Sequence, residues 1–207
     1  MTRDTVVVGP LEVNCSILGC EATGEAVVVD PGGSMELIRQ VVSQRGLKVR
    51  YIINTHGHFD HIGANKAAVA EFGAPLLIHQ ADAPMLSRSA EVARRYGLQG
   101  DNSPEADRYL EDGMEISFGN CSLQVIHTPG HTPGGCCLYL AAEKLLISGD
   151  TLFADSIGRT DLPGGSHQQL LNSIRTRLFT LPEDVDVCPG HGPDTTIGHE
   201  KHHNPYF

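Results

Sequence analysis

Short apolar segments with the period of a β-strand alternate along this chain with segments of helical periodicity. β-Branched runs at 6–8, 14–18 and 26–30, broken by glycine and proline, predict three strands that begin the fold in antiparallel order. Further strands are predicted, in chain order, at 49–54, 75–79, 114–118, 121–126, 136–140, 144–148 and 185–188. Helices are predicted at 34–45, 64–72, 81–96 and 167–179, with Ser34 and Ser166 as N-caps.

The order of these elements, strands first and a helix next, occurs twice along the chain. Such an order predicts an α/β fold in which two sheets pack face to face with helices outside. A chain of 207 residues suits one domain with a sizeable core, and no clear linker interrupts the pattern. We therefore expect a single domain over residues 1–207, with the polar segment 100–107 as a mobile surface loop.

The heptapeptide 55–61, Thr-His-Gly-His-Phe-Asp-His, concentrates candidate chemistry in one short segment. It holds three imidazoles and a carboxylate, those of His56, His58, Asp60 and His61. A packed core has no use for such a cluster, because each imidazole would need its own buried partner. Imidazole nitrogen and carboxylate oxygen are suitable ligands for Zn²⁺, Fe²⁺ or Mn²⁺. The heptapeptide therefore predicts a metal site.

Three further candidate ligands, His131, Asp150 and His191, each follow an apolar strand through a glycine. Taken singly, each has an ordinary explanation as a turn or surface residue. Beside the heptapeptide they form a matching set, because active sites gather where a rigid scaffold positions its loops. His79 and Asp82 also follow a predicted strand and could reach the rim of this site, but we expect them to form a surface pair.

Composition and charge exclude several other classes of protein. With 15 Lys and Arg against 25 Asp and Glu, the net charge of −10 argues against a nucleic-acid partner. No apolar run reaches the roughly 18 residues of a membrane span, and the N-terminus lacks the apolar region of a signal peptide. The six cysteines show no Cys-x-x-Cys spacing and are expected to be buried free thiols. We expect a cytoplasmic protein that does not bind membranes.

The set Thr-His-x-His-x-Asp-His, Gly-His131, Gly-Asp150 and Gly-His191 resembles the metallo-β-lactamase superfamily, and the likeness extends from Asp30 to His191. The resemblance implies an αββα four-layer sandwich of two mixed sheets with helices on the outer faces. The metal site of such a sandwich lies between the tops of the two sheets. The resemblance also implies that Asp30 supports the histidine loop and does not itself bind metal.

Two divalent transition metals are implied by the same resemblance, with zinc favoured and iron or manganese as alternatives. One would be held by His56, His58 and His131, a second by Asp60, His61 and His191, and Asp150 would bridge both. A water shared by two ions about 3.5–4 Å apart loses a proton near neutral pH and becomes a nucleophile. Asp60 and Asp150 would orient this hydroxide as the catalytic carboxylates. The chain lacks Gly-x-Ser-x-Gly, which argues against a serine hydrolase.

Within the superfamily, segments 148–153, 157–161 and 204–207 resemble the short glyoxalase II-like hydrolases. These resemble enzymes that hydrolyse S-acyl thioesters such as hydroxyacylglutathione, so a small-molecule thioester is the expected partner. The full-length glyoxalase II pattern continues into a helical domain that binds glutathione, and it has an aromatic residue where Asp161 stands. Arg159 keeps the cation of that pattern, either as a substrate contact or as an ion-pair partner of Asp155 or Asp161. The thiol carrier and the oligomeric state, monomer or weak homodimer, stay open.

Two alternatives to a hydrolase remain. Segment 158–161 also resembles the persulfide dioxygenases of the superfamily, which use one iron held by residues matching His56, His131 and Asp150. A non-enzymatic metal-binding module is the other alternative. It is disfavoured because a filled structural site needs no bridging aspartate.

Overall fold

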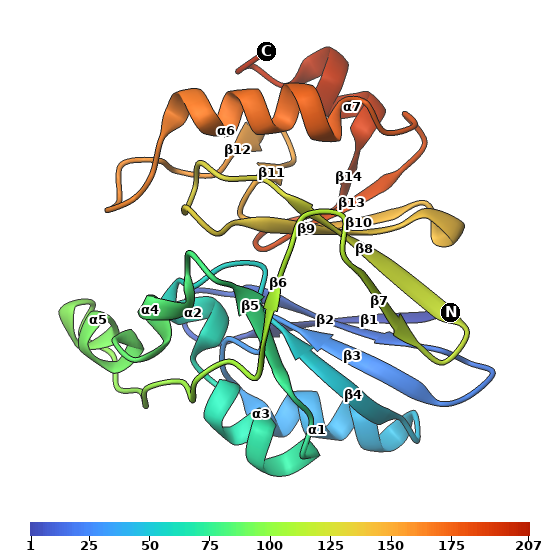
Figure 1. Cartoon of the computed structure of the whole chain (residues 1–207), viewed down its shortest axis with the longest axis vertical. Helices are drawn as coiled ribbons and strands as arrows, with labels where there is room; N and C mark the ends of the chain where they lie inside the picture. Colours follow the sequence, from blue (N-terminus) through green and yellow to red (C-terminus); the bar gives the residue numbers. More distant parts are fainter.

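Two six-stranded sheets pack face to face, with helices on their outer faces, in the computed structural model of residues 1–207 (Figure 1). The first sheet follows chain order: β1 (Thr2–Val8), β2 (Val13–Gly19), β3 (Glu25–Val29), β4 (Lys48–Ile53), β5 (Leu76–His79) and β6 (Arg108–Leu110). The second has the order β14 (Thr195–Thr196), β13 (Asp186–Pro189), β10 (Leu145–Gly149), β9 (Cys136–Leu140), β8 (Cys121–His127) and β7 (Glu115–Phe118).

Both sheets are mixed. In the first, β1, β2 and β3 pair antiparallel, as predicted, whereas β3, β4, β5 and β6 run parallel. In the second, β10 pairs parallel with β13 and the other pairs are antiparallel. The structure therefore confirms the predicted four-layer sandwich of two mixed sheets with outer helices.

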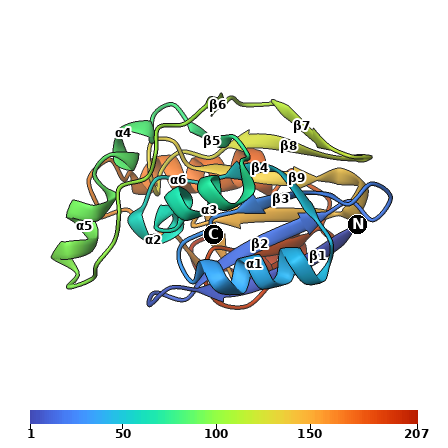
Figure 2. The same cartoon turned by 90° about the horizontal axis from the view of Figure 1, so that it is seen from below.

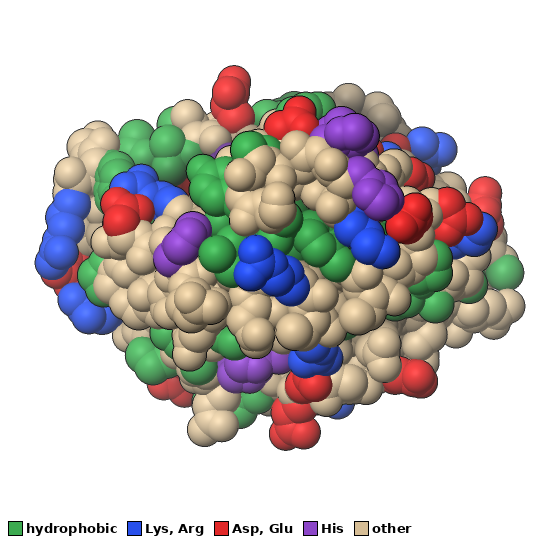
Figure 3. Space-filling view, turned by 90° about the horizontal axis from the view of Figure 1, so that it is seen from above, with side chains coloured by type: hydrophobic (Ala, Val, Ile, Leu, Met, Phe, Trp, Pro, Cys, Tyr) green, Lys and Arg blue, Asp and Glu red, His purple; other side chains and the backbone are tan.

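Helices α1 (Met35–Gln44) and α3 (Asn65–Phe72) lie on the outer face of the first sheet, as Figure 2 shows from below. Helix α6 (His167–Ser173), which continues into a π-helical turn at Ile174–Leu178, covers the second sheet together with α7 (Ile197–His203). Figure 3 shows this side of the molecule, where acidic, basic and histidine side chains are scattered without one broad patch of a single charge. None of the helices combines the length and apolar composition that a membrane crossing requires.

Central strands such as β3 and β10 are apolar runs because helices or the opposite sheet cover both of their faces. In β3, Val27 and Val29 belong to the core between the sheets, whereas Val28 packs with the outer helices. On the second sheet, Leu170 and Ile174 are fully buried in a third apolar cluster. All six cysteines are free, as predicted; five are buried and Cys121 is half-buried.

The predicted helix 81–96 is wrong as a single element. It divides into α4 (Ala83–Leu86) and α5 (Ser89–Arg95). The hydroxyl of Ser89 donates to the carbonyls of Leu86 and Asp101, and Asn102 accepts the Ala90 N–H, so a new helix begins at 89. Helical periodicity does not reveal such contacts with a distant loop.

Ser34 and Ser166 both stand at the predicted N-cap positions, but only Ser166 makes a capping hydrogen bond. Ser166 accepts the N–H of Gln169. Ser34 has φ 45° and makes no capping bond, because its hydroxyl accepts the Gly9 N–H at 3.1 Å. The short elements that were not predicted are α2 (Phe59–Ile62), β6, the 3-10 turn at Ala141–Glu143, the hairpin of β11 (Leu152–Phe153) with β12 (Ser156–Ile157), β14 and α7.

Candidate metal centre

The candidate ligands lie on loops that leave one edge of the sandwich. The heptapeptide follows β4 and runs into the single-turn helix α2 (Phe59–Ile62), and Asp30 follows the neighbouring parallel strand β3. On the second sheet, Asp150 follows β10 and His191 follows its parallel neighbour β13. Because the carboxyl ends of neighbouring parallel strands meet at one sheet edge, both sheets deliver polar side chains to the same place.

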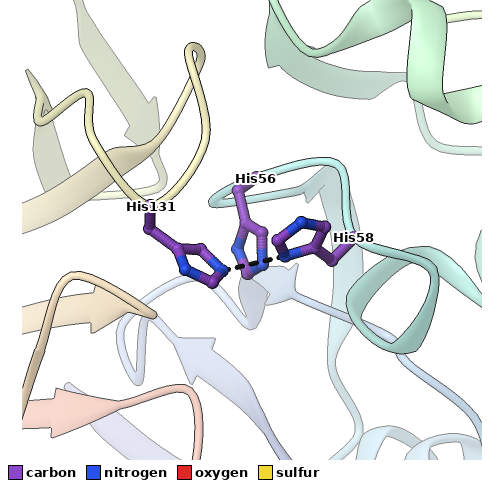
Figure 4. A group of neighbouring side chains, drawn as sticks. All are labelled: His56, His58 and His131. Atoms are coloured by element: carbon purple, nitrogen blue, oxygen red, sulfur yellow. Dashed lines mark hydrogen bonds between the residues drawn. The ribbon is translucent and has the colours of Figure 1, made fainter. Parts of the chain in front are cut away.

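A first triad is formed by His56, His58 and His131, whose rings converge from two loops (Figure 4). The Nδ1 atom of His58 lies 2.8 Å from Nε2 of His131, and the ring centroids of His56 and His131 are 4.8 Å apart. Each residue offers one nitrogen within 4.8 Å of the other two. The Nε2 atom of His56 is buried and has no hydrogen-bond partner in the protein. Since a buried imidazole nitrogen normally has a partner, this atom fits a metal ion.

A second triad is formed by Asp60, His61 and His191, with donor atoms that also lie within 4.8 Å of one another. The Nε2 atom of His191 lies 3.4 Å from Oδ2 of Asp60 and 3.3 Å from Nε2 of His61. His61 is fully buried, whereas the His191 side chain is 29% exposed, so this triad faces the solvent on one side.

Asp150 lies between the triads. Its Oδ1 is 3.3 Å from Nε2 of His61, and its Oδ2 is 3.5 Å from Nε2 of His131 and 3.7 Å from Nε2 of His191. This close approach depends on Gly190, where an added Cβ would lie 2.2 Å from Oδ1 of Asp150. The structure therefore brings all seven predicted ligands together, with one carboxylate facing both triads.

Buried hydrogen bonds orient these side chains from behind. Asp30 accepts the N–H of Thr55 at 2.7 Å, the Thr55 hydroxyl at 2.6 Å and Nδ1 of His61 at 3.0 Å. On the other loop, Nδ1 of His131 donates to the carbonyl of Arg159 at 2.7 Å. Because Nδ1 of His61 and Nδ1 of His131 each have a partner outside the cluster, Nε2 is the nitrogen of each ring that is left to face the cluster.

At His56 and Asp150 the electrostatics favour the forms that bind metals. At His61, burial acts to lower the pKa, but the carboxylates of Asp150 and Asp30 more than offset it and raise this pKa. Burial and the neighbouring imidazoles hold the pKa of His56 well below its ordinary value, so this ring is neutral. Burial acts to raise the pKa of Asp150, but the imidazoles of His61 and His131 more than offset it and lower this pKa. Neutral imidazole and ionised carboxylate are the forms that act as metal ligands. Five imidazoles and two carboxylates thus form a donor set that fits two divalent cations.

The position of Asp82 after a strand allowed it to reach the rim of the site, but the preferred prediction, half of a surface pair, is wrong. Its side chain is fully buried. One oxygen accepts the N–H of Gly57 at 2.9 Å and the other accepts the N–H of Gly134 at 2.7 Å. The available signal was its position, three residues after β5, at the same sheet edge as the ligands.

Arg159 lies on the loop after β12, where its carbonyl holds His131. Its guanidinium, 58% exposed, forms a two-point ion pair with Asp161 at 2.7 and 2.8 Å. The hydrogen bond from Arg159 lowers the pKa of Asp161 to about 2. Asp155, the other predicted partner, instead bonds to His199 at 2.8 Å. The Arg159 side chain is therefore paired with Asp161 at the surface, and both members of this pair are exposed.

The fold and the ligand set define a metal-binding α/β sandwich, and comparison with known proteins identifies its family. The model of the metallo-β-lactamase superfamily matches residues 8–191, so the chain belongs to this superfamily. The probable metallo-hydrolase YqgX of Bacillus subtilis is 37% identical over 202 residues, 97% of this chain and 94% of the relative. Hydroxyacylglutathione hydrolase GloC of Haemophilus influenzae is 34% identical over 209 residues, 100% of this chain and 98% of the relative.

Solved structures agree with this assignment. BLEG-1 B3 metallo-β-lactamase is 38% identical with a TM-score of 0.91, covering 99% of both chains. TTHA1623 in a di-iron-bound form has the same identity and TM-score, covering 99% of this chain and 100% of the other. ETHE1 from Myxococcus xanthus is 29% identical with a TM-score of 0.83, covering 99% of this chain and 84% of the other. The protein is therefore an enzyme of the metallo-β-lactamase superfamily and has the fold of its short metallohydrolases.

Proposed function

We propose that this protein is a binuclear metallohydrolase that cleaves S-acyl thioesters of the hydroxyacylglutathione class. The observation that carries the proposal is the position of Asp150, whose two oxygens face both triads. A carboxylate shared by two triads is what a pair of neighbouring cations requires. The thioester substrate is supported by the similarity to GloC, which extends over the whole of this chain.

The triad His56, His58 and His131 would hold one metal ion, and Asp60, His61 and His191 the other. When bound, a pair of divalent transition metals supplies an activated water nucleophile and polarises the substrate carbonyl. Zinc is favoured by the nitrogen-rich donor set. The similarity to a di-iron structure keeps iron, with manganese, as the alternative.

The protein's own carboxylates have two tasks in this reaction. Asp60 and Asp150, with side chains 15% and 12% exposed, are open enough to accept a hydrogen bond from the attacking water and so direct its lone pair. Their negative charges also offset the charge of the cations. A thiolate leaves without prior protonation, so the reaction needs no strong general acid.

Arg159 is proposed to bind the substrate. Its present partner, Asp161, is 67% exposed. Exposed ion pairs contribute little to stability, so a carboxylate on the thiol carrier can take the place of Asp161 at small cost. The His131 ring donates its hydrogen bond to the Arg159 carbonyl, so substrate binding by the Arg159 side chain leaves that contact in place.

The test pairs metal analysis with a substrate panel on the same preparation. The panel contains S-lactoylglutathione, other acyl thioesters, a β-lactam, and glutathione persulfide with oxygen uptake recorded. The proposal expects about two equivalents of transition metal per chain and hydrolysis of a thioester. Turnover of the β-lactam alone, a substrate class suggested by the similarity to BLEG-1, would contradict it.

A mononuclear iron persulfide dioxygenase is the second candidate. His56, His131 and Asp150 also lie together: Nε2 of His131 is 3.5 Å from Asp150, and the His56 and His131 centroids are 4.8 Å apart. Two imidazoles and one carboxylate form the face that binds a single iron in oxygenases. One tightly bound iron, no second site and oxygen uptake with glutathione persulfide would favour this candidate.

A further inference from the structure

The segment 79–85, which leads from β5 into α4, contacts both loops of the first triad without supplying a proposed ligand. Asp82 is at its centre and is fully buried. Its Oδ2 accepts the N–H of Gly57, between His56 and His58, and its Oδ1 accepts the N–H of Gly134, three residues after His131. One carboxylate thus joins a loop of the first sheet to a loop of the second.

The two loops pack directly on this segment, and both contact points are glycines. An added Cβ at Gly134 would lie 2.7 Å from Cγ of Asp82, and one at Gly57 would lie 3.0 Å from the Asp82 carbonyl. A second contact repeats the connection, because the ring of His79 stacks on that of His127 at 4.2 Å with an interplanar angle of 9°. The segment, which follows β5 of the first sheet, therefore contacts the second sheet at two places, Gly134 and His127.

The two buried carboxylates near the centre have different partners. The hydrogen bonds of Asp30 reach His61 of the second triad and Thr55, whose hydroxyl lies 3.0 Å from Nδ1 of His56 in the first. Those of Asp82 reach only the backbone beside the first triad. The histidines His58 and His131 are 73 residues apart in the chain, yet their nitrogens lie 2.8 Å apart.

We propose that Asp82 is a positioning residue that sets the separation of the two loops at which the first triad binds a metal ion. This inference rests on the proposed metal centre. Asp82 acts through two charge-assisted hydrogen bonds to backbone N–H groups, which are stronger and shorter than neutral ones. Outer partners of metal ligands usually control metal affinity in this way.

Asp82→Asn provides the perturbation. The amide of asparagine has the shape of the carboxylate, but only one of its two terminal atoms can accept an N–H. Either Gly57 or Gly134 then faces an amide donor, so one loop is released while the other stays bound. Glu200→Gln is the matched control: Glu200 is also fully buried and accepts bonds from Thr195 and Asn204, with no contact to the triads.

The experiment measures Co²⁺ binding to the full chain after removal of metal, by calorimetric titration and by visible absorption of the bound ion. For Asp82→Asn we expect one of two Co²⁺ equivalents to bind about 10–100-fold more weakly, with an altered absorption band, while the other is unchanged. Glu200→Gln should retain both affinities even if its unfolding midpoint falls.

Wild-type affinity for both equivalents in Asp82→Asn would overturn the inference. So would an equal loss at both sites that matches the loss in Glu200→Gln, because this pattern means general destabilisation. If Asp82→Asn does not fold, Gly134→Ala pushes a methyl group against the same carboxylate and must weaken the same equivalent. Wild-type protein that binds two Co²⁺ ions but cleaves no thioester would contradict the proposed reaction and leave this test intact.

Discussion

Replacing Asp30 with asparagine weakens the hydrogen bonds that hold the heptapeptide 55–61 and leaves every proposed metal ligand in place. The Asp30 side chain, 2% exposed, accepts three hydrogen bonds, and its Oδ2 receives both the Thr55 hydroxyl and Nδ1 of His61. In the variant, the amide oxygen can keep the Thr55 N–H, which leaves an NH₂ group facing the other two donors. The Thr55 hydroxyl can rotate to become an acceptor, but the His61 ring can accept only if its proton moves to Nε2.

The magnitude follows from these contacts. The lost bond between His61 and a buried carboxylate contributes about 1.5–3 kcal/mol to stability. A proton on Nε2 of His61 also blocks the nitrogen that faces Asp60 and Asp150, so affinity for the second metal should fall about 10–100-fold. Backbone strain does not confuse the result, because Asp30 has φ 53° and asparagine adopts this region as readily as aspartate.

The assay is urea unfolding of the metal-free protein, followed by metal competition with a chromophoric chelator. Asp155→Asn is the matched control, since Asp155 has φ 54° but an exposed side chain away from the cluster. The control should match wild type in both measurements. A stability loss in Asp30→Asn below about 0.5 kcal/mol, the range of ordinary surface substitutions, together with unchanged metal affinity, would refute the reasoning.

Three further predictions address the ligands, the substrate and the loop scaffold. His191→Ala should remove one metal equivalent and lower thioesterase activity at least about 100-fold, and full activity in this variant would mean that the second metal is dispensable. As a control, replacement of the exposed His199 by alanine should leave the metal content and the activity unchanged. Arg159→Ala should raise KM with kcat and the unfolding midpoint unchanged, and an unaltered KM would remove this side chain from substrate binding. Gly130→Ala should lower the free energy of unfolding in urea by about 1–3 kcal/mol, because a Cβ there would lie 2.3 Å from the Leu170 nitrogen. An unchanged free energy of unfolding would show that helix α6 can shift away from the added methyl group at little cost.

The parts of the fold that sequence patterns predicted are those with a strong local signal. Strand β3 contains the β-branched run Val27–Val29, which is covered on both faces, so its position follows from composition alone. The heptapeptide was informative for a different reason: four candidate ligands in six residues have no structural use without a metal. Glycines at the ends of apolar strands indicated His131, Asp150 and His191, and the resemblance to the superfamily then assigned these ligands to two ions.

The features that sequence patterns missed depend on contacts between distant residues. Asp82 bonds to backbone N–H groups 25 and 52 residues away, and a backbone partner leaves no mark in the sequence. The Ser34 hydroxyl accepts the N–H of Gly9, 25 residues before it, and makes no capping bond to its helix. Strands β6 and β14 have three and two residues, too few to display a period of two.

Anomalous diffraction from crystals of the metal-loaded protein would locate the ions themselves. We predict two peaks per chain, one among the nitrogens of His56, His58 and His131, and one among the donor atoms of Asp60, His61 and His191. Both peaks should lie within bonding distance of Asp150, about 2.0–2.2 Å for zinc. A single peak held by His56, His131 and Asp150, or no peak among these residues, would contradict this prediction.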